Sequence, residues 1–172
     1  GLNLNILLTQ IETLQNSLVQ LEARTENILS PQDPNDANSF PGANLLTIPG
    51  VGPKTLAALL SAVGSNGQSF PDGKHLIGYV GFFPKIYQSG ETKRENEISN
   101  RGPKYLRWAL YMAAVACLKH NPEFKALYDR KISQGKDPKQ ALIYVAKKLA
   151  HLCLSMLKSG ESYNPARVFM PV

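Results

Sequence analysis

Cysteine and histidine are scarce in this sequence of 172 residues. The two cysteines, Cys117 and Cys153, are too few for the disulfide framework of a small secreted domain. His75, His120 and His151 are far apart and lack the paired spacing of a metal site. We therefore expect both cysteines to be small buried hydrophobes and these residues to hold no metal or other cofactor.

Long apolar runs are also missing. No stretch approaches the roughly 18 apolar residues that a membrane-spanning helix needs, and no signal peptide opens the chain. Because 43% of the residues are hydrophobic, the chain can still bury a core. We expect a soluble, cytoplasmic protein with no membrane partner. A helical pattern is already present at Leu2 and no Met precedes it, so we also expect part of a longer protein.

The motifs of several enzyme classes are absent as well. The sequence contains neither a phosphate-binding P-loop nor a nucleophile elbow. Glu91, Glu95 and Glu97 share a basic segment and offer no close carboxylate pair for two-metal nuclease chemistry. The chemistry therefore has to come from other residue types.

Charge divides the chain into two unequal parts. Residues 1–42 carry one base and five acids, whereas residues 43–172 carry 18 bases and 8 acids. Such an asymmetry is typical of a protein whose basic part binds a polyanion, most often nucleic acid. A solvated basic surface without a partner is the alternative.

The sequence predicts three segments, namely residues 1–29, 30–42 and 43–172. The first contains a heptad pattern that favours a dimerising coiled coil over an amphipathic helix packed on its own domain. The second holds three prolines and reads as a linker. The heptad seam consists of Leu4, Leu7, Ile11, Leu14, Leu18, Leu21, Thr25 and Ile28.

Residues 45–64 resemble a helix-hairpin-helix motif, which binds nucleic acid without reading its sequence. Gly50 and Gly52 permit a tight turn, and Pro53 suits the first position of the following helix. Bare backbone N–H groups at that helix start, together with Lys54, would bind a phosphate. A helical hairpin that only packs is the alternative.

The remaining pattern predicts a small helical bundle, so the fold class is mainly α. One long polar loop, residues 83–102, interrupts it, with room for a short hairpin through Ile86 and Ile98. Helices are expected at residues 72–82 (capped by Asp72), 103–120, 122–134 and 137–158, before a tail at 159–172.

The loop carries the chemistry that remains. Ser89 stands beside Gly90, and a hydroxyl there could attack a phosphodiester held by cations. Tyr87 is a second candidate nucleophile, whereas Ser99 is expected to cap or to precede the following helix. The candidate phosphate ligands in and after the loop are Lys93, Arg94, Arg101, Lys104 and Arg107.

Four strings occur in a recognisable order: IPGVGPKTLAALL, YVGFFPKIYQSGETKR, ISNRGPKYLRWALYMAA and VAKKLAHLCLSMLKSG. They closely resemble the C-terminal half of the insertion-sequence transposase family numbered one hundred and ten. That family includes Piv-type DNA invertases and bridge-RNA-guided recombinases. The resemblance runs from about residue 45 to residue 167.

The resemblance implies a function and roles for particular residues. The family's catalytic serine lies in a Pro-x-x-x-x-Ser-Gly string, which here runs from Pro84 to Gly90, so Ser89 would form a covalent bond to DNA. The later family pattern falls on Ser99, Gly102, Leu106 and Arg107. A guide RNA and a coiled-coil dimer are the partners implied besides DNA.

The sequence departs from the family in one respect. An N-terminal RuvC-like domain, which would hold magnesium in an acidic tetrad, is not among these 172 residues. We therefore expect these residues to bind nucleic acid weakly and to cleave nothing alone. The alternative functions are a non-catalytic helix-hairpin-helix module for nucleic-acid binding and dimerisation, and a purely structural bundle.

Overall fold

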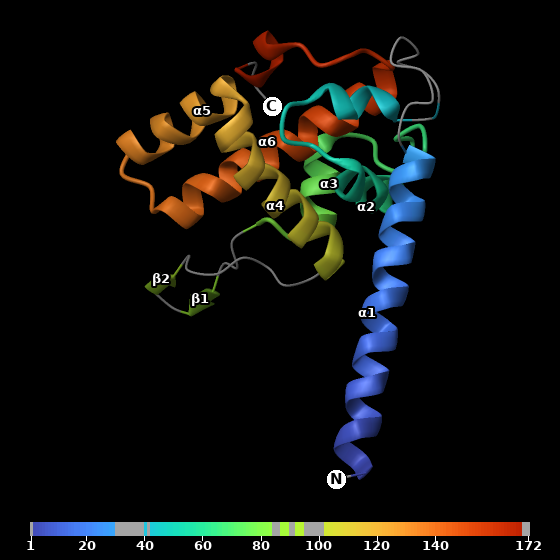
Figure 1. The fold of residues 1–172 in the computed structure, drawn as a ribbon. Coiled ribbons are helices and arrows are strands. Elements are labelled where there is room, and N and C mark those ends of the chain that lie inside the picture. Colours follow the sequence, from blue (N-terminus) through green and yellow to red (C-terminus); the bar gives the residue numbers. More distant parts are fainter. Residues whose placement is uncertain are drawn as a thin grey trace.

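A computed structural model describes residues 2–29, 40, 42–83, 87–89, 92–94 and 102–169. The described residues form six α-helices, two short 3₁₀ helices and one two-stranded hairpin (Figure 1). The predicted mainly α fold is confirmed. None of the described helices is long and apolar enough to cross a membrane. Most of the predicted linker, residues 30–42, lies outside the described residues.

Helix α6, Pro138–Ser159, is the centre of the bundle. It packs against α3 (Gly73–Val80), α4 (Lys104–His120) and α5 (Pro122–Ser133). Buried side chains occur on every turn of α6, because the helix packs against all three neighbours. The apolar residues that the sequence analysis identified at helical spacing therefore continue along its whole length. The fully buried ones are Ala141, Val145, Ala146, Leu149, Ala150, Cys153 and Met156.

Prolines and capping side chains begin these helices at the predicted places. Pro53 is the first residue of α2, Pro53–Val63. Asn121 accepts a hydrogen bond from the Phe124 N–H at 3.3 Å at the start of α5, and Asp137 accepts one from Lys139 N–H at 2.9 Å at the start of α6. Observed and predicted helix bounds in this part of the chain differ by no more than two residues.

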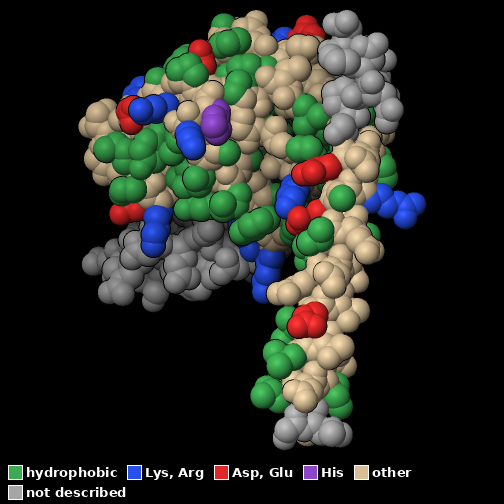
Figure 2. Space-filling view, in the orientation of Figure 1, with side chains coloured by type: hydrophobic (Ala, Val, Ile, Leu, Met, Phe, Trp, Pro, Cys, Tyr) green, Lys and Arg blue, Asp and Glu red, His purple; other side chains and the backbone are tan. Residues whose placement is uncertain are grey.

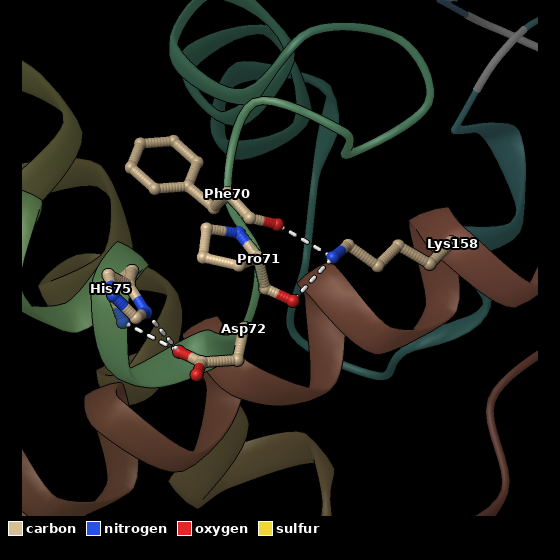
Figure 3. A network of polar contacts seen from close by, with 5 residues as sticks. All are labelled: Phe70, Pro71, Asp72, His75 and Lys158. Carbon is tan, nitrogen blue, oxygen red and sulfur yellow. Dashed lines mark hydrogen bonds and ion pairs between the residues drawn. The ribbon is translucent and has the colours of Figure 1, made fainter.

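The end of α6 is tied to the start of α3 (Figure 3). Lys158 Nζ donates to the backbone carbonyls of Phe70 at 2.6 Å and Pro71 at 2.8 Å. Asp72 then caps α3 by accepting a hydrogen bond from the His75 N–H at 2.9 Å, as the sequence predicts. That backbone bond, followed by the His75 side chain, lowers the pKa of the Asp72 carboxyl. Helix α3 is therefore held in place from its first residue.

Helix α1, Leu2–Leu29, extends away from the bundle as a long arm (Figure 1). Only its C-terminal end packs, through α2, where Leu29 is buried and Glu22 and Thr25 are half-buried. Except for Thr25, every side chain of the predicted heptad seam is exposed to solvent. Figure 2 shows hydrophobic side chains uncovered near the free end of the arm. The coiled coil stays a prediction, because no second chain is present.

The first helix of the predicted helix-hairpin-helix motif, within residues 45–64, is not an α-helix. A 3₁₀ helix of five residues, η1 (Ala43–Thr47), stands there, followed by a turn into α2. Ile48 precedes Pro49 and has an extended backbone (φ −78°, ψ 116°), because the proline ring disfavours the helical region for the residue before it. The helix therefore ends after one and a half turns.

Asn44 in η1 gives a stability prediction. Its buried Nδ2 donates to the carbonyls of Met156 and Glu161, at 2.8 Å each, and joins η1 to the end of α6. Asn44→Ala removes both donors, so we expect the free energy of unfolding to fall by about 2 kcal/mol in a urea titration. Asn66→Ala, which removes only one exposed turn contact to Gln68, is the matched control. Equal losses in the two variants would contradict the buried role of Asn44.

Candidate nucleic-acid interface and serine loop

Ser89 is the last residue of a short β-strand. Strand β1, Tyr87–Ser89, pairs antiparallel with β2, Thr92–Arg94, and Ser89 lies opposite Thr92. The hairpin therefore forms earlier in the loop than predicted, because Tyr87 pairs with Arg94 and not with a residue near Ile98. The register also places Lys93 opposite Gln88 and Arg94 opposite Tyr87, so both cationic residues lie on the strand that pairs with the one ending at Ser89.

Part of the predicted site is outside the described residues. Ser99, Arg101 and Gly90 fall in the segments that the structure does not describe, and Lys93 and Arg94 are described by their backbone. Lys104 is exposed on the first turn of α4. Its position beside the end of the loop fits the predicted role of a phosphate ligand.

The two ends of the serine loop, residues 83–102, meet at the C-terminus of α3. Gly102 has φ +108°, and a Cβ there would overlap the carbonyl oxygen of Tyr79. Arg107 Nη1, from the first turns of α4, donates to the carbonyl of Val80 at 2.9 Å. At the other end Phe82 is fully buried. The loop therefore starts and ends on a fixed base.

A cluster of three cation–π contacts lies where the serine loop begins. Phe83 leads into the loop, and Lys147 Nζ lies 5.5 Å from the centre of its ring. The same ammonium group lies 5.3 Å from the ring centre of Tyr144, which Lys131 also approaches, at 4.8 Å. Burial lowers the pKa of Lys147. The sequence analysis missed this cluster because its four residues come from three separate segments.

The two glycines of the predicted phosphate-binding turn are in different surroundings. Gly50 has φ +102°, and a Cβ there would overlap the backbone of Ala116 and Cys117 in α4. Gly52 has an extended backbone, and a Cβ there would meet nothing within 4 Å. Gly50 is thus required for close packing. Only Gly52 has open space for a ligand at the start of α2.

Lys54 has a partner that the sequence analysis did not predict. Its Nζ lies 2.8 Å from Glu22 Oε1 on α1, with the Lys54 side chain 52% exposed and the Glu22 side chain 41% exposed. The hydrogen bond with Glu22 is the main reason that the pKa of Lys54 is raised. Figure 2 shows basic and acidic side chains together where α1 meets the bundle. A phosphate at this turn would have to compete with a carboxylate.

The described residues do not fit a metal ion. Nowhere in the described ranges do three or more His, Cys, Asp or Glu side chains gather closely enough to bind one. Cys117 and Cys153 are buried, as predicted. Burial raises the pKa of the Cys117 thiol to about 12 and raises that of Cys153 as well, so both stay protonated at neutral pH.

Two exposed aromatic side chains on α4 were also missed. Tyr105 and Trp108, called the aromatic pair below, lie off the buried face of the helix, with ring centres 6.1 Å apart and ring planes 29° apart. The buried face consists of Leu106, Ala109, Leu110, Ala113 and Ala114, as the sequence predicts. The sequence did hold a signal for this exposure, because these two large apolar residues fall outside the predicted buried face of the helix.

Comparison with known proteins gives the family. A sequence profile described as "Transposase IS116/IS110/IS902 family" matches residues 42–129, which is more than half of the chain. The chain belongs to this transposase family. The match includes the turn at Gly50, the serine loop and all of α4.

Individual relatives agree with this assignment. The chain is 35% identical over 120 residues to "Insertion element IS110 uncharacterized 43.6 kDa protein" of Streptomyces coelicolor, covering 70% of this chain and 29% of the relative. It is 37% identical over 122 residues to the "Pilin gene-inverting protein" of Moraxella bovis, covering 70% and 38%. This transposase-family chain thus spans about a third of the length of the curated relatives it matches.

Gly102 provides a test of the loop base. In Gly102→Ala both the positive φ and the contact with Tyr79 O are unfavourable, so we expect the free energy of unfolding to fall by about 3 kcal/mol. Gly135→Ala is the matched control, because Gly135 also has a positive φ (+79°) but nothing within 4 Å of its Cβ position. That variant should lose about 1 kcal/mol in the same urea titration. Similar losses would show that Gly102 does not pack against α3.

Proposed function

We propose that this chain is the serine-bearing and DNA-binding part of a recombinase that moves or inverts a segment of DNA. The family match over residues 42–129 carries the proposal. The similarity to a pilin gene-inverting protein supports it, since inversion of a gene requires DNA strands to be cut and rejoined. Because the chain spans 29% and 38% of the two relatives, the proposal concerns a longer protein.

Ser89 is the proposed nucleophile. Its Oγ would form a bond to a backbone phosphorus of DNA as the bond from that phosphorus to one deoxyribose oxygen breaks. The serine proton would end on the leaving oxygen, and the DNA strand would remain attached to the protein. A phosphodiester carries negative charge that grows during this attack, so cations close to Ser89 would lower the barrier.

Lys93 and Arg94 are the cations best placed for that role. They belong to β2, whose register with β1 pairs Arg94 with Tyr87 and Lys93 with Gln88, on the strand that ends at Ser89. Arg101 and Lys104 would add phosphate contacts where the loop returns to α4. Arg107, whose Nη1 donates to the carbonyl of Val80 at the base of the loop, is also a proposed phosphate ligand.

DNA or RNA backbone would also contact Gly52 and Lys54, in the turn that Gly50 shapes by packing against α4. These contacts would give affinity without sequence preference. We propose that sequence choice comes from a guide RNA and that the exposed apolar arm α1 pairs with the α1 of a second copy.

In this proposal magnesium would be held by a separate RuvC-like domain, as the resemblance of the sequence to its family implies. A serine hydroxyl is a weak nucleophile at neutral pH unless another group activates it. These 172 residues alone would therefore bind DNA weakly and leave it intact.

The function is tested by recombination in the longer protein. We expect Ser89→Ala to abolish the recombined DNA product, measured by amplification across the new junction. Ser133→Ala, at an exposed serine at the end of α5, is the matched control and should retain the product. If Ser89→Ala recombines normally while DNA binding is intact, the chain is a non-catalytic clamp. If DNA binding does not weaken as salt rises, the chain is a structural bundle.

The Lys54–Glu22 pair gives a prediction for DNA binding. Glu22→Gln removes the competing carboxylate, so we expect the affinity of this chain for duplex DNA to rise about two- to fivefold in low salt. The slope of log affinity against log salt should become steeper by about 0.9, as for one added phosphate contact.

Glu12→Gln is the matched control for that experiment. It removes the same charge from the same helix, at a position away from Lys54, and should change the affinity little. Equal gains in both variants would show a general effect of net charge. No gain in Glu22→Gln would remove Lys54 from the proposed interface.

A further inference from the structure

The aromatic pair on α4 is exposed in a way that folding does not require. The side chains of Tyr105 and Trp108 are 58% and 55% exposed, although they are among the largest apolar surfaces that a residue can bury. Met112 and Val115 continue the same stripe along α4 and are also exposed. Single exposed apolar side chains are ordinary, but a row of four on one helix face is typical of a binding surface.

The surroundings of the aromatic pair favour a polyanion. Lys104 precedes Tyr105 and is exposed, and α4 packs against α2, whose first turn carries the exposed Lys54. The serine loop returns to the bundle at Gly102, three residues before Tyr105. The two rings thus lie between the two elements proposed to contact DNA backbone.

The ring geometry favours a flat ligand. The rings of Tyr105 and Trp108 are stacked, with centres 6.1 Å apart and planes inclined by 29°, and both side chains keep more than half of their surface exposed. Proteins bind single strands with this combination, in which aromatic rings stack on bases and neighbouring cations contact phosphates. A second copy of α1 would offer aliphatic side chains, which need no such alignment of rings.

We infer that Tyr105 and Trp108 form a stacking platform for unpaired bases of a DNA strand opened next to the phosphate that Ser89 attacks. This inference rests on the proposed function and adds to it a specific ligand, the unpaired base. Duplex DNA hides its bases within the stack, so the platform would bind DNA only where the strands have separated.

Trp108 reports on this site directly, because it is the only tryptophan in the chain. We expect its fluorescence to be quenched when the 172-residue chain is titrated with a single-stranded oligodeoxynucleotide. An abasic oligodeoxynucleotide of the same length keeps the phosphates and lacks the bases. It should still bind, by anisotropy of an end label, and leave the fluorescence nearly unchanged.

Variants separate stacking from charge. Trp108→Ala should lower the affinity for the single strand about tenfold, whereas its affinity for the abasic strand should not change. Trp108→Phe, which keeps a ring, should stay within about threefold of the parent chain. Phe169→Ala is the matched control, because Phe169 is also an exposed aromatic residue beside a cation, Arg130, but lies in the C-terminal segment. It should bind as the parent chain does.

Several outcomes would overturn the inference. Equal quenching by the abasic strand would exclude base stacking while leaving the proposed DNA contacts intact. Tighter binding of an RNA strand of the same sequence would make RNA the ligand of the pair. A change in Trp108 fluorescence with protein concentration alone would assign the stripe to a second copy. Absence of any binding to DNA would overturn the inference together with the proposed DNA-binding function.

Discussion

The burial of α6 is the constraint on which the rest of the structure depends. Its side chains face α3, α4 and α5 together, so these three helices can take only a narrow range of positions around it. Lys158 then fixes the entrance to α3, and the far end of α3 receives Gly102 and Arg107 from the other side of the serine loop. An unbroken series of contacts therefore runs from the core to the base of the loop that carries Ser89.

This arrangement combines a fixed base with a loop of long, polar sequence. A nucleophile must be aligned with a phosphate, and positioning of this kind accounts for a large part of catalysis in general. The clamped ends of the loop limit where Ser89 can lie relative to α4, whose first turns carry Lys104 and the aromatic pair. At the start of α2, Lys54 forms an ion pair with Glu22 of α1. The arm that is proposed to pair with a second copy therefore also influences the turn proposed to contact DNA.

Local features of the sequence predicted much of the fold. Prolines at helix starts, the cap Asp72 and the apolar spacing of α4 and α6 each act within a few residues, so they could be read directly. Features that depend on contacts between distant segments could not be predicted from the sequence in this way. Packing brings the Cys117 backbone against Gly50 and the Glu22 carboxylate to Lys54. The early end of the first helix, by contrast, had a local signal in the sequence, because Ile48 stands before Pro49. The position of Ser89 at the end of a strand likewise required the register of the hairpin.

The most direct test of the account is to identify the atom that becomes linked to DNA. The longer protein would be incubated with its flanking RNA, magnesium and a donor DNA, and denatured. The DNA-linked peptide would then be sequenced by mass spectrometry. The account predicts a single phosphodiester link at Ser89. A link at Tyr87 or at any other hydroxyl would contradict it, and so would recombined DNA formed without any covalent protein–DNA intermediate.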